Sequence, residues 1–459
     1  MSELLEIAAK QSIVSVPLGD VLVEIRNGLV ADQEKEKPGI PITRIETISK
    51  GVVDLERVRY VRNTDGLKLD RFWLKSGDIL FSHINSDLHL GKTAIVMSDA
   101  PLLHGMNLLV LRTDREKLLP RYLHHWLDFC RRSGVFMAIA QHAVNQSSLN
   151  QKKITSLRIP LPSIDEQEKI VAELEKQFSR LDEAVANLQR VKANLKRYKA
   201  SVLKDAVEGR LVPTEAELAR REGRTFETGE QLLQRLLEVR RARPKGKSKY
   251  KEPAEPDTSG VGEVPDGWVW ASVEQLVAHL TDGDHQAPPQ TDSGVPFLVI
   301  GNVRGGEIDL ADTRFVGEAY YNSLDPYRQP KLGDLLYTLV GSYGIPVRVK
   351  TEEPFCIQRH MAILRPHEQS PMDYLTIAME SNEVFKQATA VATGTAQMTV
   401  PLSGLRKIAI GLPPDAEQRR IVAEVDRRLS LVRGVEAEVD TNLKRARALR
   451  QATLAKAFA

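Results

Sequence analysis

One stretch of this 459-residue chain occurs twice, at a constant offset of 251 residues. The first copy begins LPSIDEQEKIVAE at Leu161, the second begins LPPDAEQRRIVAE at Leu412, and 8 of these 13 positions are identical. Repeats of solenoid proteins are much shorter, with periods of about 20 to 50 residues. The duplication therefore predicts two copies of one large module, each ending in a long helix.

The sequence after each copy has the periodicity of a coiled-coil helix. From Asp165 to about Glu208 there is neither proline nor glycine, and apolar residues recur at steps of three and four. A helix over this segment would span about 66 Å, at about 1.5 Å per residue. Propensity alone does not stabilise so long a helix in water, so its apolar stripe needs a partner. The second copy is the nearest candidate.

The second apolar stripe differs from the first at two positions. Glu436 and Asn442 stand where the first copy has Val185 and Val191, and polar residues within a stripe can fix the pairing register at a cost in stability. The residues expected to form the subunit-docking surface of the helices are Leu174, Phe178, Leu181, Leu188, Leu195, Val425, Leu429, Val432, Val439 and Leu443.

The segment before each helix is typical of a mixed α/β (α+β) module. Short β-branched and apolar runs alternate with turn residues, as strands require, while Leu118–Phe129 and Gly134–Gln141 are expected to be helical. The run KSGDILFSHI at Lys75 is matched by KLGDLLYTLV at Lys331. The expected domains are residues 1–163 (first module), 164–209 (first long helix), 210–267 (linker), 268–414 (second module) and 415–459 (second long helix).

The linker changes character along its length. Thr228–Arg243 is expected to be a short helix with Thr228 as its cap. Arg240–Lys251 holds seven basic residues and no acidic one, and Pro253–Asp266 is rich in proline, glycine and acid. We expect a flexible linker. Its basic half is either a solvated charge run or a segment that lies on a phosphate backbone or an acidic partner.

Overall composition indicates the cellular environment of the protein more than it indicates the function. The chain carries 64 Lys and Arg against 61 Asp and Glu, so its net charge of +3 neither demands nor excludes nucleic acid. Its two cysteines, Cys130 and Cys356, fall in different modules, which argues against a disulfide framework. Met1–Ser12 is a helix-prone leader without the pattern of a signal peptide. Because no apolar run approaches the roughly 20 residues of a membrane span, we expect a soluble, cytoplasmic protein with no membrane partner.

Several enzyme signatures are missing. Gly91-Lys92-Thr93 resembles the end of a P-loop, but Ser86 stands where that motif requires glycine. There is no GxGxxG after a strand and no Asn- or Asp-Pro-Pro-Tyr. We expect His83 and His89 to be surface loop residues, not metal ligands, and His124 and His125 to pack within a helix. The sequence therefore favours a binding and scaffolding protein with no catalytic residues and no metal site.

Two polar loops recur at matched places in the modules. The first follows the Gly-Asp-apolar strand (Ser82–Lys92 and Thr338–Arg348), and the second precedes the last strand (Ala143–Lys153 and Ala392–Val400). Loops of this kind on a stiff scaffold suit contacts to base edges or phosphates, although plain solvation explains any single residue equally well. The candidate DNA-binding residues are Arg44, Ser82, His83, Asn85, Lys92, Asn145, Gln146 and Ser147 in the first module, and Asn302, Arg304, Ser342, Tyr343, Arg348, Thr395 and Gln397 in the second.

Along its whole length the chain resembles the specificity (S) subunit of type I restriction–modification enzymes. The paired EQ..IVAE motifs at Leu161–Glu173 and Leu412–Glu424 carry the resemblance. The helix end YKASVLKDAVEGRLV at Tyr198–Val212, echoed at Leu449–Ala459, and the connector at Lys249–Trp270 support it.

The resemblance implies a function and a set of partners. Each module would be a target recognition domain reading one half of a split, asymmetric site on double-stranded DNA. The long helices would pair as an antiparallel coiled coil in a pseudo-twofold arrangement and dock the modification (adenine methyltransferase) subunits. Those subunits and a restriction subunit would bind S-adenosylmethionine, ATP and Mg²⁺, and this chain would bind no cofactor. The alternative is a structural adaptor that assembles partner proteins without reading DNA.

Overall fold

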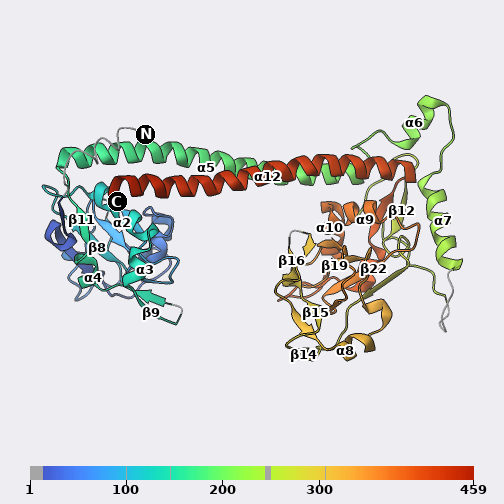
Figure 1. Ribbon diagram of the computed structural model, residues 1–459, viewed down its shortest axis with the longest axis horizontal. Helices are drawn as coiled ribbons and strands as arrows, with labels where there is room; N and C mark the ends of the chain where they lie inside the picture. The colour runs from blue at the N-terminus through green and yellow to red at the C-terminus, as the bar shows by residue number, and fades with distance from the viewer. Residues whose placement is uncertain (1–13, 100, 145, 243–249, 305) are drawn as a thin grey trace. The chain divides into compact units, whose positions relative to one another are not determined.

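The computed structural model describes residues 14–99, 101–144, 146–242, 250–304 and 306–459 (Figure 1). The chain divides into two compact units. The first unit comprises Met1–Arg190 with Val439–Ala459, and the second comprises Val191–Glu438. The predicted leader Met1–Ser12 lies outside the described residues. Each unit contains a mixed α/β module together with a part of each long helix, so the predicted fold class is confirmed.

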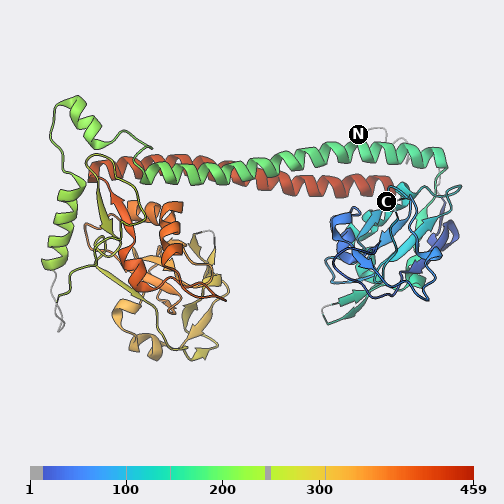
Figure 2. The ribbon, with the colours of Figure 1, turned by 180° about the vertical axis from the view of Figure 1, so that it is seen from behind.

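Both predicted long helices are present, α5 over Ile164–Val207 and α12 over Asp415–Phe458, with 44 residues each. Their segments run side by side within each unit (Figures 1 and 2). In the first unit Arg450 pairs with Asp182 at 2.7 Å, and the hydroxyl of Thr453 lies 3.5 Å from the side-chain oxygen of Gln177. Because the numbering rises along one helix as it falls along the other, the two segments are antiparallel. In the second unit one apolar core joins Val202, Leu203 and Ala206 of α5 to Ile421, Val425 and Leu429 of α12.

The two modules share a four-stranded antiparallel sheet with the same connectivity. In the first unit its order is β2 (Leu22–Asn27), β8 (Leu109–Thr113), β5 (Ile79–Phe81) and β7 (Thr93–Ile95). In the second unit it is β13 (His279–Asp282), β22 (Met361–Arg365), β19 (Leu335–Thr338) and β20 (Pro346–Arg348).

A further strand pair ties each module to the start of its long helix. β1 (Ser15–Pro17) pairs with β11 (Arg158–Pro160), and β12 (Val269–Ser272) pairs with β23 (Ala409–Leu412). The first unit adds β3 (Ile40–Ile42), β4 (Arg59–Val61), β6 (Ile84–Asn85), β9 (Gln141–Ala143) and β10 (Gln146–Ser148). The second adds β14 (Gln290–Thr291), β15 (Val295–Leu298), β16 (Val303–Arg304), β17 (Glu307–Ile308), β18 (Arg314–Val316) and β21 (Cys356–Ile357).

Short helices cover these sheets and line the core of each unit. In the first unit the large buried side chains include Phe81, Tyr122 and Phe136, which pack with apolar residues of α5 and α12. The helices of the first module are α2 (Pro120–Arg132), α3 (Val135–Ile139) and α4 (Gln151–Thr155). Those of the second unit are α6 (Glu215–Glu222), α7 (Gly229–Ala242), α8 (Glu318–Ser323), α9 (Met372–Glu380), α10 (Asn382–Val391) and α11 (Leu402–Lys407).

The prediction of a helix over Gly134–Gln141 is wrong at the C-terminal end. α3 stops at Ile139, Ala140 is extended, and Gln141 begins strand β9. Pairing of β9 with β10 overrides the helical propensity of this alanine-containing stretch. Strand pairing of this kind depends on residues that the local periodicity does not reveal.

The described part of the linker is folded onto the second unit, so the prediction of a flexible linker is wrong for these residues. The amide of Ala254 donates to Glu274 at 3.0 Å, and the indole of Trp270 donates to the carbonyl of Gly262 at 3.2 Å. Arg240, which belongs to the predicted basic run, has a side chain only 11% exposed and donates to the Glu274 carbonyl at 3.0 Å. Arg241 is paired with a nearby glutamate. Residues 243–249 of that run lie outside the described residues.

None of the helices in the described part of the chain is both long enough and apolar enough to cross a membrane.

Candidate nucleic-acid interface

In the first unit the two predicted polar loops are joined into one small sheet. β6, from the loop after β5, pairs with β10, and β10 pairs with β9. The amide of Leu149 also donates to the carbonyl of His83 at 2.8 Å. Segments about 60 residues apart in the sequence therefore form a single surface, which we name the first loop platform (residues 82–92 and 141–149).

The second unit joins its two loops in the same way. The amide of Val400 donates to the carbonyl of Leu339 at 2.8 Å, and Gly341 donates to Met398 at 3.0 Å. Leu149 and Val400 are matching positions of the repeat, as are His83 and Leu339. The second loop platform (residues 338–348 and 392–400) thus uses the backbone connection of the first with different side chains.

Four predicted contact residues of the first module serve the platform itself. Ser82 and His83 are buried, so the prediction of His83 as a surface residue is wrong, and burial lowers its pKa to about 4. The amide of Asn85 donates to Ser82 at 3.0 Å. Lys92 donates to the carbonyl of Ser49 at 3.0 Å, and burial lowers its pKa as well. These four side chains hold the loops in place, so direct contacts to DNA would have to come from other residues of the platform.

The remaining first-module candidates lie in different settings. Gln146 is exposed on β10, and Ser147 beside it is buried. Arg44 is 42% exposed and lies 3.4 Å from a carboxylate oxygen of Glu46. Asn145 lies outside the described residues. The structure adds two exposed residues of β9 to this surface, Gln141 and His142. The sequence had placed Gln141 at the end of a helix and His142 in no element.

In the second module the exposed candidates are Ser342, Thr395 and Gln397 on the loop platform. Tyr343 stacks on Phe385, with ring centroids 5.4 Å apart and an interplanar angle of 9°. Arg348 is half-buried at the end of β20.

Two other second-module candidates stand apart from this surface. Asn302 is buried, and its side chain accepts from Val299 at 3.0 Å and donates to the carbonyl of Asp312 at 3.2 Å, so its amide is not free to read a base. Arg304 belongs to β16, but its side chain is not among those described. The structure adds Arg359, which is exposed and precedes His360, whose carbonyl accepts from Leu339 at 2.8 Å.

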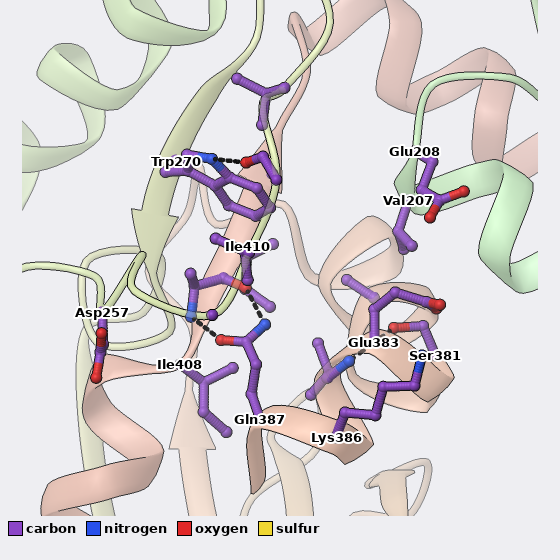
Figure 3. A pocket seen from close by; sticks show the side chains of 18 of the residues that line it. Val207, Glu208, Asp257, Trp270, Ser381, Glu383, Lys386, Gln387, Ile408 and Ile410 are labelled. Atoms are coloured by element: carbon purple, nitrogen blue, oxygen red, sulfur yellow. Dashed lines mark hydrogen bonds between the residues drawn. The ribbon is translucent and has the colours of Figure 1, made fainter. Parts of the chain in front are cut away.

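The second unit also contains a groove of about 840 Å³ between the end of α5, the linker and α9 to α11 (Figure 3). Gln387 reaches across one wall and bonds both the amide (2.8 Å) and the carbonyl (2.9 Å) of Ala409. The indole of Trp270 bonds to backbone as well. The side chains of Gln387 and Trp270 therefore complete backbone hydrogen bonds of the fold.

A smaller cleft of about 380 Å³ in the first unit contains His124 and His125. His124 bonds to Thr93 at 3.2 Å, His125 lies against Phe178, and burial lowers the pKa of His125 to about 4. Both rings are therefore packing residues, as the sequence suggested. In the part of the chain that is described, no group of three or more His, Cys, Asp or Glu residues is placed to hold a metal ion.

Comparisons with known proteins bear on this arrangement. Residues 12–196 match the family "Type I restriction modification DNA specificity domain". The chain is 49% identical over 154 residues to a type I restriction enzyme specificity subunit (MjaX) of Methanocaldococcus jannaschii, a match that covers 33% of this chain and 36% of that protein. It is 24% identical over 456 residues to the EcoBI specificity subunit of Escherichia coli, which covers 96% of this chain and 84% of that one.

A solved structure from work on complex assembly in the type I restriction–modification system shares the fold. The two chains are 19% identical, each is covered over 97% of its length, and the TM-score is 0.61. Subunits of this family provide specificity and are not themselves catalytic. Residues 12–196 therefore belong to the type I restriction–modification DNA specificity domain family, and the similarity to the EcoBI specificity subunit extends over both modules.

Proposed function

We propose that this specificity subunit recognises an asymmetric, bipartite DNA target, with one half-site read by each loop platform. The observation that carries the proposal is the repeated backbone hydrogen bond, from Leu149 to His83 and from Val400 to Leu339. The same frame presents different side chains in the two units. Two different half-site sequences are the expected consequence.

The chemistry of the exposed platform residues suits the major groove of DNA. A two-stranded β-ribbon fits that groove, and amide and hydroxyl side chains can bond to base edges there. Gln141 and Gln146 offer such groups in the first unit, and Ser342, Thr395 and Gln397 offer them in the second. Exposed cations near the platforms, such as Arg359, would contact phosphates and make binding dependent on salt.

We propose further that the long helices set the spacing between half-sites and dock the modification subunits. Six of the predicted docking residues are buried, and this supports a role in helix pairing and core packing: Leu174, Phe178, Val425, Leu429, Val432 and Val439. The other four are half-buried: Leu181, Leu188, Leu195 and Leu443. Docking is better supported for exposed apolar residues of α12, namely Leu431 (63% exposed), Val435 (44%) and Leu449 (56%).

The partners would supply the reaction chemistry. In this proposal the modification subunits bind S-adenosylmethionine and methylate adenine, and a restriction subunit uses ATP and Mg²⁺. The specificity subunit would select the DNA sequence and provide the surface on which the other subunits assemble.

Exchange of one module tests the proposal. Residues 13–163 would be replaced by the corresponding module of another specificity subunit, and the assembled methyltransferase would select sites from random duplexes. One half of the target should change while the other half and the spacing stay constant. Exchange of residues 268–414 is the matched control and should change the other half only. A target that neither exchange alters would refute the proposal.

The alternative function, an adaptor that does not read DNA, makes a different prediction in the same assay. The complex would then shift random duplexes without enriching any sequence. The paired loop platforms favour recognition, because an adaptor has no need for the same joined-loop frame carrying exposed amides and hydroxyls in both modules.

A further inference from the structure

Three polar side chains lie in a row across the first loop platform. His142 on β9 and Asn85 on β6 are the cross-strand neighbours of Ser147 on β10. The Nδ1 atom of His142 lies 2.8 Å from the hydroxyl oxygen of Ser147, and that hydroxyl donates to the carboxylate of Asp87. Ser147 is 1% exposed, while the side chain of His142 is 54% exposed.

This network fixes which nitrogen of His142 carries the proton. An ionised carboxylate only accepts hydrogen bonds, so Ser147 must give its single proton to Asp87. The hydroxyl oxygen can then only accept from His142, which requires a hydrogen on Nδ1. In the neutral ring the other nitrogen, Nε2, is left as a hydrogen-bond acceptor on a half-exposed side chain.

The surroundings of His142 fit insertion into a groove. β9 and β10 form an antiparallel ribbon, the kind of element that the major groove admits. Val144, in the turn that follows β9, is 91% exposed, and an apolar side chain there can contact the methyl group of thymine.

We propose that His142 reads an exocyclic amino group in the half-site of the first unit, either N4 of cytosine or N6 of adenine. These are the base-edge donors that the major groove presents to an acceptor. Ser147 and Asp87 are positioning residues that hold the tautomer. The inference rests on the proposed function, because it names one base contact of that recognition.

The test uses the assembled methyltransferase complex and duplexes randomised in both half-sites. His142→Ala should lower discrimination at one base pair of the first half-site by about 10- to 100-fold, the range for a good base contact. The second half-site should be unchanged. Ser147→Ala should weaken discrimination at the same base pair, while Ser147→Thr, which keeps the hydroxyl, should restore it. Asp65→Asn, an exposed change outside the platform, is the matched control.

Modified DNA then identifies the group that is read. At the affected position, adenine would be replaced by purine or cytosine by 2-pyrimidinone, each of which lacks the amino group. Wild-type binding should fall about 10-fold or more, the lower end of the range for a base contact, and binding by the His142→Ala protein should not fall further.

The possible failures are distinguishable. If the wild-type complex selects no sequence, the proposed function fails and this inference fails with it. If the wild type selects a bipartite site and His142→Ala selects it equally well, only the inference is overturned. A uniform loss of affinity for all sequences, with thermal unfolding unchanged, would also overturn it, because it would indicate a phosphate contact.

Discussion

The Asp78 carboxylate accepts two hydrogen bonds of 2.7 Å from the guanidinium of Arg112. The second unit repeats this pair with Asp334 and Arg365, at 2.8 Å. Asp78 is 1% exposed and also accepts from the backbone amide of Lys75 at 2.8 Å. The pair therefore fixes the turn that enters the strand leading to each loop platform.

Asp78→Asn should destabilise the first unit by about 3 kcal/mol, because it removes the carboxylate that accepts two hydrogen bonds from the partly buried Arg112 and leaves that cation with Glu24 alone, at 2.8 Å. Chemical denaturation of the full chain, followed by hydrogen exchange of peptides from each unit, measures this. Asp334→Asn should have the same effect on the second unit, and exposed Asp65→Asn should have almost none. A loss shared equally by both units would contradict the local role of the pair.

The glutamine of the repeated motif should matter unequally in its two copies. Gln167 accepts from the amide of Leu119 at 2.9 Å and donates to the carbonyls of Lys117 (2.8 Å) and Pro162 (3.0 Å). It thereby clamps the start of α5 to the start of α2. Gln418 has one such bond, to Pro413 at 2.7 Å.

Gln167→Ala should therefore cost about 2–3 kcal/mol, since it removes three hydrogen bonds made by a buried side chain. Gln418→Ala should cost about 1 kcal/mol, as expected for a single hydrogen bond. Equilibrium unfolding of the two variants gives the comparison directly. Equal losses would mean that the clamp contributes little beyond burial of the side chain.

The sequence predicted the parts of the fold that rest on local periodicity. The stripes of α5 and α12 extend over many turns, and repetition of the module supported its α/β character. The joining of the loops depends on hydrogen bonds such as Leu149 to His83, between segments far apart in the sequence. Local pattern contains no information on that register. Candidates such as Asn302 and Lys92 were chosen by residue type, and only the burial of Asn302 and the hydrogen bond of Lys92 to the Ser49 carbonyl show that they support the structure.

Two matched glycines test how firmly each loop platform is held. At Gly91 (φ +74°) an added Cβ would lie 2.2 Å from the ring of Phe136, and at Gly344 (φ +87°) it would lie 2.6 Å from the ring of Phe385. Phe136 is 1% exposed and packs edge-on against another ring, whereas Phe385 is 41% exposed.

Gly91→Ala should destabilise the first unit by about 3 kcal/mol, combining backbone strain with overpacking of a fixed ring. Gly344→Ala should cost about 1–2 kcal/mol, mostly strain, because the exposed ring can move aside. That movement displaces Tyr343, so discrimination in the second half-site should weaken while the first half-site is unaffected. Unfolding and site selection together report both effects, and the opposite order of stabilities would contradict the argument.

The glutamate of the repeated motif has opposite surroundings in its two copies. Glu417 is fully buried and accepts from the amide of Glu215 at 2.7 Å and from the indole of Trp268 at 2.9 Å. Burial raises the pKa of Glu417 above its usual value of 4.5. Glu166 instead accepts from the hydroxyl of Ser163 at 2.8 Å, which lowers the pKa of Glu166.

These directions set the pH dependence of stability. Because the folded-state pKa of Glu417 is raised, its contribution is fully present below about pH 4.5 and is lost as pH rises through the folded-state value. Glu417→Gln removes this dependence, so the stability of the wild type relative to this variant should fall between about pH 4 and pH 7. The folded-state pKa of Glu166 is lowered, so its contribution is present above the unfolded value and is lost on acidification. Relative to Glu166→Gln, the wild type should therefore gain stability as pH rises towards about 4.5, and the difference should stay level above that pH. Denaturant unfolding at several pH values measures both slopes, and slopes of the same sign would contradict the assignment of burial to one copy and capping to the other.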